Sequence, residues 1–204
     1  MDWWLRIRLA RPIAAALALC ALLGTLADSL TVPVPVLVGG ISFPLPLPFL
    51  LPLLPVCLLL QGQARAVPAM EGTGARAVWP LDAALVMTCA AAALAVGAAQ
   101  VAMGGGAVGI GMARNLLGYL GLTLLLQLLG NPRLTAATVA LLPISCAAFG
   151  VANGSPAFWA WPLHEPDSLL AFTQASALFC AGLACTALPH LLVRPTAGPR
   201  RSGL

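Results

Sequence analysis

The sequence predicts an all-α polytopic membrane protein, and three observations support this prediction. Of the 204 residues, 60% are hydrophobic and only 8% are charged, whereas soluble globular domains contain about 25% charged residues. A membrane span needs about 20 apolar residues, so six spans take roughly 120 residues, which matches the hydrophobic share. Apolar runs also recur along the chain between short connections that contain proline, glycine or arginine. A soluble domain of ordinary size does not fit beside six such spans.

Six apolar runs have the length and composition expected of spanning helices. The first run also resembles a secretory signal peptide, because arginines precede it and small residues end it, but we interpret it as a span. Residues 1–12 form an N-terminal interfacial segment with Trp3 and Trp4, residues 13–193 form one transmembrane domain, and residues 194–204 form a polar tail. The predicted spans cover about residues 13–27, 49–61, 81–103, 112–129, 134–151 and 168–193.

The connections between these runs differ in character. Residues 28–48 are rich in proline, which forbids a continuous helix, and their alternation predicts an extended pair or a Pro-rich external loop. Residues 61–82 form the longest polar connection, and residues 104–111 form a glycine connection. Residues 130–133, Gly-Asn-Pro-Arg, predict a sharp turn. Residues 153–167 form an aromatic loop before the last span, which Asp167 and Ser168 are expected to cap.

The basic residues predict the orientation of the chain in the membrane. All ten are arginine, and the chain contains no lysine. With six spans and a cytoplasmic N-terminus, nine arginines lie inside and only Arg114 lies outside, a strong positive-inside bias. We therefore expect a multi-pass membrane protein with both termini in the cytoplasm. The arginines are at positions 6, 8, 11, 65, 76, 114, 133, 194, 200 and 201.

The same composition argues against several function classes. A phosphate-binding loop of the P-loop type needs a lysine, as does a Schiff-base cofactor site, and the chain has none. The six cysteines show no C-x-x-C spacing, so we interpret them as buried thiols. The net charge of +4 reflects membrane orientation, and no nucleic-acid partner is expected.

The predicted hydrocarbon segments contain almost no ionisable residue, only Arg114 and His190 near their ends. Proton relays through membranes need such residues, so a proton-driven transporter is disfavoured, while sodium coupling through backbone carbonyls stays open. If the chain moves a solute uphill, a separate subunit most simply supplies the energy. We expect no cofactor and no metal in this chain.

The layout resembles the small six-span permease subunits of type-2 ABC exporters from GC-rich bacteria. The stretches that carry the resemblance are ARAVPAMEGTGARAVWPLD at 64–82, ARNLLGYLGLTLL at 113–125 and FWAWPL at 158–163. It implies a location in a bacterial cytoplasmic membrane. It also implies that ATP and Mg²⁺ bind in a partner ATPase, and that two permease subunits, identical or different, and two ATPases form one transporter. It also implies that Pro68–Arg76 is a coupling helix for the ATPase, although Gly72 and Gly74 interrupt it. The turn at Pro132 would be the lesser contact.

Each candidate site also has a simpler interpretation. The candidate partner-coupling residues are Arg65, Pro68, Glu71, Arg76, Pro132 and Arg133. For Arg65, Glu71 and Arg76, the alternative is a solvated loop with incidental charges. Arg114 and Asn115 either cap the outer end of a helix by snorkelling or contact a substrate or anion. Trp159, Trp161 and His164 are candidates for an outer gate or substrate pathway. For the two tryptophans, the alternative is an interfacial aromatic belt.

Two other functions remain open from the sequence. One is a substrate-binding membrane subunit of a vitamin-type importer, which is also six-span and of similar length. The other is an integral-membrane enzyme that uses His164, Glu165 and Asp167 at the outer face, since these residue types serve metal sites and acid–base chemistry. We favour a non-enzymatic permease subunit that exports an apolar or amphipathic compound, because the interior is almost uncharged.

Overall fold

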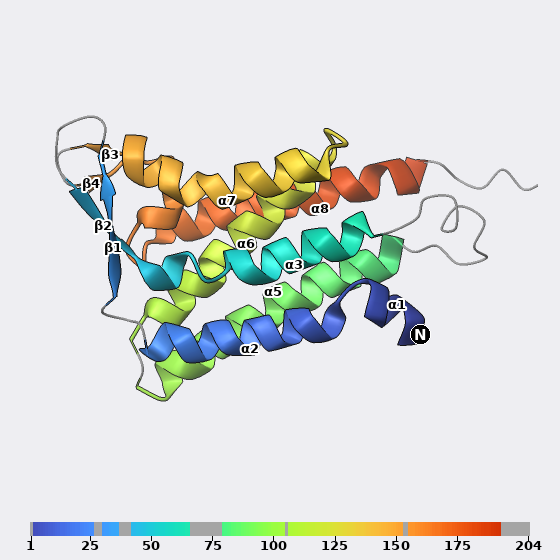
Figure 1. Cartoon of the computed structure of the whole chain (residues 1–204), viewed down its shortest axis with the longest axis horizontal. Helices are drawn as coiled ribbons and strands as arrows, with labels where there is room; N and C mark the ends of the chain where they lie inside the picture. The colour runs from blue at the N-terminus through green and yellow to red at the C-terminus, as the bar shows by residue number, and fades with distance from the viewer. Residues whose placement is uncertain are drawn as a thin grey trace, which may run out of the picture.

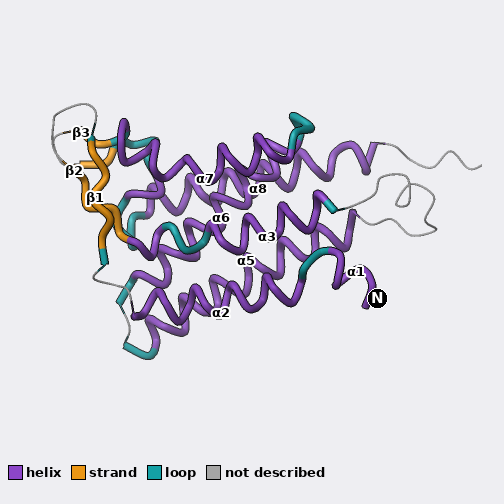
Figure 2. The backbone as a smooth tube through the Cα atoms, in the orientation of Figure 1, coloured by secondary structure: helices purple, strands orange, loops and turns teal. Residues whose placement is uncertain are grey.

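The computed structural model describes residues 2–26, 30–36, 42–65, 79–104, 106–152 and 155–192. Long helices lie side by side and alternate in direction, and short strands gather at one end of this bundle (Figures 1 and 2). The helices are α1 (Asp2–Ile7), α2 (Ala10–Leu26), α3 (Leu53–Ala64), α5 (Trp79–Ala102), α6 (Val108–Gln127), α7 (Pro132–Phe149) and α8 (Leu169–Leu192).

Five helical segments in the described part of the chain are long and apolar enough to cross a membrane. They are Leu47–Ala64, Trp79–Ala102, Val108–Gln127, Pro132–Phe149 and Leu169–Leu188. The first predicted span, residues 13–27, corresponds to α2, an apolar helix of 17 residues that is shorter than these five. The chain is therefore a mostly helical protein with the elements of a multi-pass membrane protein.

The proline-rich segment contains two short strands. Strand β1 (Thr31–Pro35) pairs antiparallel with β2 (Ser42–Pro46), with Pro33 opposite Pro44. The prolines of both strands fall in one alternating set of register positions, so the intervening residues can supply the N–H donors of the ladder. Val34 and Leu45 are buried and pack against α7.

Helix α6 is the central element, because 78% of its spanning window is buried. It begins at Val108, four residues before the predicted position 112, since Gly109 is helical and forms part of the α5–α6 contact. A Cβ on Gly97 of α5 would lie 2.7 Å from the Gly109 carbonyl oxygen. On the α8 side, a Cβ on Gly121 would lie 2.4 Å from the α8 backbone. Glycine at these positions allows close helix approach.

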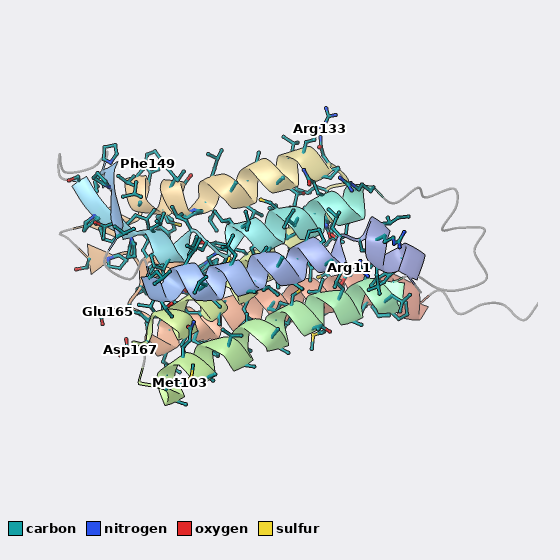
Figure 3. All side chains as sticks on the ribbon, turned by 60° about the horizontal axis from the view of Figure 1, so that its bottom comes forward. Arg11, Met103, Arg133, Phe149, Glu165 and Asp167 are labelled. Carbon is teal, nitrogen blue, oxygen red and sulfur yellow. The ribbon has the colours of Figure 1, made fainter. Side chains whose placement is uncertain are left out.

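The two ends of the bundle differ in charge. Arg11 and Arg133 lie at one end and Glu165 and Asp167 at the other (Figure 3). We call the first the arginine end and the second, where β1 and β2 lie, the hairpin end. The arginine end also holds α1, the last turn of α3 and the first turn of α5 (Figure 1). The described arginines at this end are Arg6, Arg8, Arg11, Arg65 and Arg133.

Candidate functional site

Arg114 is buried in α6 near the hairpin end. Its side chain is 0% exposed, so the interpretation that it snorkels to water is wrong. Its guanidinium group donates to the carbonyl oxygens of Glu165 at 2.6 Å and His164 at 3.0 Å. It also donates twice to Oδ1 of Asn115, at 3.2 and 3.3 Å, and lies 5.9 Å from the ring centre of Phe49. The fixed fork of arginine donors therefore holds the backbone of the loop before α8 against α6.

The neighbours of Arg114 on α6 bind the same loop. Asn115 donates from Nδ2 to the Pro162 carbonyl at 3.1 Å. Pro162 lies in the short 3₁₀ helix η2 (Trp161–Leu163). Tyr119 packs its ring 5.2 Å from that of Trp161 and donates its hydroxyl to the Phe49 carbonyl at 3.3 Å. Trp161 is buried against Gly118, so the expectation that it belongs to an interfacial belt is wrong, while Trp159 is 44% exposed.

His164, Glu165 and Asp167 do not form a cluster. The His164 Nε2 contacts the Ala157 carbonyl at 3.1 Å, whereas Glu165 and Asp167 are exposed. Ser168 accepts from the Ala171 N–H at 3.4 Å, which is the capping role that the sequence predicted for this position. Within the described residues, no three His, Cys, Asp or Glu side chains are arranged to hold a metal ion. The hairpin-end residues thus form an anchored loop in which backbone carbonyls are the main acceptors.

At the arginine end, the predicted turn between α6 and α7 has the geometry that its sequence indicates. Gly130 has a φ of +75°, which glycine adopts without strain. The Asn131 side chain accepts from the N–H groups of Arg133 and Leu134, and Pro132 occupies the first turn of α7. Pro132 and Arg133 are exposed, as is Arg65 after α3. Pro68, Glu71 and Arg76 of the predicted coupling segment lie outside the described residues.

Arg8 is the residue that connects the elements at this end. It lies between α1 and α2, its side chain is 3% exposed, and it forms a salt bridge with Asp82 of α5. The pair is bidentate, with Nε donating to Oδ1 at 2.9 Å and Nη2 donating to Oδ2 at 2.7 Å. Nη1 of Arg8 donates to the carbonyls of Gly62 at 3.4 Å and Gln63 at 3.3 Å, in the last turn of α3. Arg8 therefore binds the helices on both sides of segment 66–78.

Two further contacts tighten this connection. A Cβ on Gly62 would lie 2.5 Å from the Arg8 carbonyl oxygen. The backbone of the α1–α2 junction therefore contacts α3 at a position where a side chain would not fit. That junction turns at Leu9, which has a φ of +56°, an uncommon conformation for a residue with a side chain. The Gln127 side chain donates to Gln63 Oε1, which links α3 to the end of α6 and hence to the turn before α7.

An apolar cavity of about 290 Å³ lies between α2, α3, α5 and α6. Its walls are mainly small side chains, and Gln100 is the one amide side chain among its lining residues. Gln100 donates to the Ala21 carbonyl at 3.0 Å. Apolar cavities of about 150 Å³ already bind benzene and stay free of water. A cavity of this size and lining suits an apolar group.

The sequence indicated the two polar ends but not the pairing of Arg8 with Asp82. Both residues fell on the predicted cytoplasmic side, which was the available signal, but nothing in their 74-residue separation indicated contact. Comparison of the chain with protein-family models, curated proteins and solved structures gave no match. The functional conclusion therefore rests on the chain's own residues.

Proposed function

We propose that this chain is the transmembrane permease subunit of an ATP-binding-cassette exporter. In this proposal α2 acts as a sixth span, because 17 residues rise about 25 Å and reach the lower limit for crossing. The arginine end lies in the cytoplasm of a bacterial cell, as the positive-inside rule requires. Both termini are then cytoplasmic, and the loop anchored by Arg114 faces the outside.

The observation that carries the proposal is the network around Arg8. A subunit driven by a separate ATPase needs an inner surface that moves as one body with its spans. Arg8 bonds to the end of α3 and the start of α5, which flank segment 66–78, and the Gln63–Gln127 contact adds the end of α6. Force applied to that segment would therefore reach three helices together.

The mechanism that follows is alternating access. Two ATPase subunits hold ATP and Mg²⁺, and their closure moves segment 66–78 and the turn at Pro132. Rigid helices, packed closely at Gly121 and Gly97, transmit this movement to a pathway shared with a second permease subunit. The apolar cavity between α2 and α5 supports an apolar or amphipathic cargo.

Affinity purification of the tagged chain from its native host tests this proposal. We expect a nucleotide-binding ATPase to co-purify, and we expect its recovery to fall when Arg65 and Arg133 are both replaced by glutamate. Glu165→Lys, an equally exposed charge change at the hairpin end, is the matched control and should leave recovery unchanged. A purified chain that transports cargo in liposomes without nucleotide would contradict the proposal.

A further inference from the structure

A second cavity, of about 300 Å³, lies at the arginine end between α3, α5, α6 and α8 and is partly open. It differs from the first cavity because its lining contains charged and hydrogen-bonding side chains. The polar lining residues are Arg8, Gln63, Asp82, Gln127 and Thr186.

The depth of each lining residue follows from the direction of its helix. Helix α5 begins at the arginine end, whereas α6 and α8 end there (Figure 1). Val86 therefore lies about one turn deeper than Asp82, and Leu124 and Leu183 lie nearly one turn deeper than the polar residues that follow them. The cavity is thus polar near the arginine end and apolar toward the middle of the bundle.

Among the described residues that line the polar level, the charges balance. The two charged lining residues, Arg8 and Asp82, are paired with each other through two hydrogen bonds. An ion placed here would lose its hydration without gaining a dedicated counter-charge, which is costly. The other polar groups of the described lining are two carboxamides, which both donate and accept, the Thr186 hydroxyl, which donates to its own helix and can still accept, and the indole N–H of Trp79, a donor.

We propose that this cavity binds the head of an amphipathic molecule whose polar group is uncharged and carries an amide or hydroxyl. The head lies at the level of Gln63, Gln127 and Thr186, and the first carbons of its apolar part lie against Leu124 and Leu183. The volume is about twice that of a cavity that holds benzene, which suits a small head with a few methylene groups. If the proposed export function is correct, this is where cargo enters from the inner leaflet.

The test uses the purified full chain in lipid nanodiscs and three probes with the same eight-carbon tail. The probes are N-octylacetamide, octyltrimethylammonium and octanesulfonate, and binding is measured by equilibrium dialysis against protein-free nanodiscs. We expect the neutral probe to bind about tenfold more tightly than either ion. Equal binding of all three would overturn the proposal, as would no binding above the protein-free discs, which would mean that the cavity holds only water or lipid.

Variants locate the site. Gln127→Leu should weaken binding of N-octylacetamide by about threefold to tenfold, the value of one hydrogen bond. Ala83 of α5 also lines this cavity, and Ala83→Leu should abolish binding by filling it. Gln174→Leu is the matched control, because Gln174 donates to the Phe158 carbonyl near the start of α8 and lines neither cavity, and it should bind like the parent. Thr186→Val provides a second test if Gln127→Leu does not fold. An equal loss in Gln174→Leu and Gln127→Leu would refute the assignment.

This experiment contains no ATPase, so its outcome is separate from that of the proposed function. Specific binding without a co-purifying ATPase would support the site and contradict the transporter assignment. A co-purifying ATPase without probe binding would do the reverse.

Discussion

Replacing Arg114 with methionine tests the anchoring of the loop before α8. The change keeps a long side chain but removes all four hydrogen bonds of the guanidinium group. The carbonyl oxygens of His164 and Glu165 then lose a charged donor in a site where Arg114 itself is 0% exposed. We expect the loop to detach locally from α6 before the bundle unfolds.

The magnitude follows from these contacts. The Glu165 carbonyl keeps its bond from the Ser168 N–H, so the two acceptors left without a donor are the His164 carbonyl and the buried Asn115 Oδ1. Each costs about 1–3 kcal/mol, so the two cost about 2–6 kcal/mol. Removing a buried charge offsets part of this loss, so we expect the free energy of unfolding to fall by about 2–4 kcal/mol. Arg114→Lys retains the charge but not the fork of donors, and it should recover part of the difference.

Two measurements on the purified protein check this prediction. Denaturant unfolding in mixed micelles gives the free energy of unfolding, and hydrogen exchange reports on the loop amides. The amides of Ala160, Leu163 and Ser168 bond to carbonyls within this loop and should exchange faster in Arg114→Met. Arg133→Met, at an exposed arginine, is the control and should change stability by less than about 0.5 kcal/mol.

An Arg114→Met protein with parental stability and parental exchange in the loop would show that Arg114 does not anchor the loop. Such a result would mean that the packing of Trp161 on Tyr119 and the Asn115 bond to Pro162 hold the loop unaided. Loss of transport with both properties intact would instead favour the substrate-contact interpretation of Arg114.

Three further predictions concern packing, the arginine end and a helix cap. Gly121→Ala should lower the free energy of unfolding by about 1–3 kcal/mol in the same assay, since the new methyl group would clash with the α8 backbone. Gly106→Ala is the control and should change that free energy little, because the space around Gly106 is open. Arg8→Gln and Asp82→Asn should each lower the free energy of unfolding, and their double-mutant cycle should give a coupling energy of about 0.5–3 kcal/mol. Strict additivity of the two effects would show that the pair is not coupled. Asn131→Ala should lower stability by about 0.5–2 kcal/mol through loss of the N-cap, and an unchanged midpoint would contradict that role.

The local elements were predictable because their signals are local. The turn at Gly130–Pro132 and the Ser168 cap use residue types whose side chains or backbone act within a few positions. The pairing of strands in the proline-rich segment was one of two options left open by the sequence. The start of α6 was placed too late because glycines there were interpreted as a loop, whereas Gly109 forms part of a helix contact.

The candidate sites depended on distant contacts and were predicted less well. Arg114 stood out as the one arginine on the outer side, but its 51-residue separation from Glu165 gave no indication that it binds backbone carbonyls. Trp161 belonged to an aromatic stretch typical of an interface, yet it fills the space that Gly118 leaves on α6. In both cases the partner lies on another helix, and single-sequence patterns do not specify it.

The amino-acid sequence by itself determined that the chain is mostly helical and apolar, and it predicted that nine of the ten arginines lie on one side. The helical structure follows from the cost of exposing polar backbone groups to lipid. Each apolar run avoids that cost by forming its own backbone hydrogen bonds as a helix. Which helices touch was decided only by the tertiary structure, because packing in lipid depends on small residues and polar groups that must meet across helices. The Arg8–Asp82 pair, the Arg114 anchor and the polar cavity arise from that arrangement.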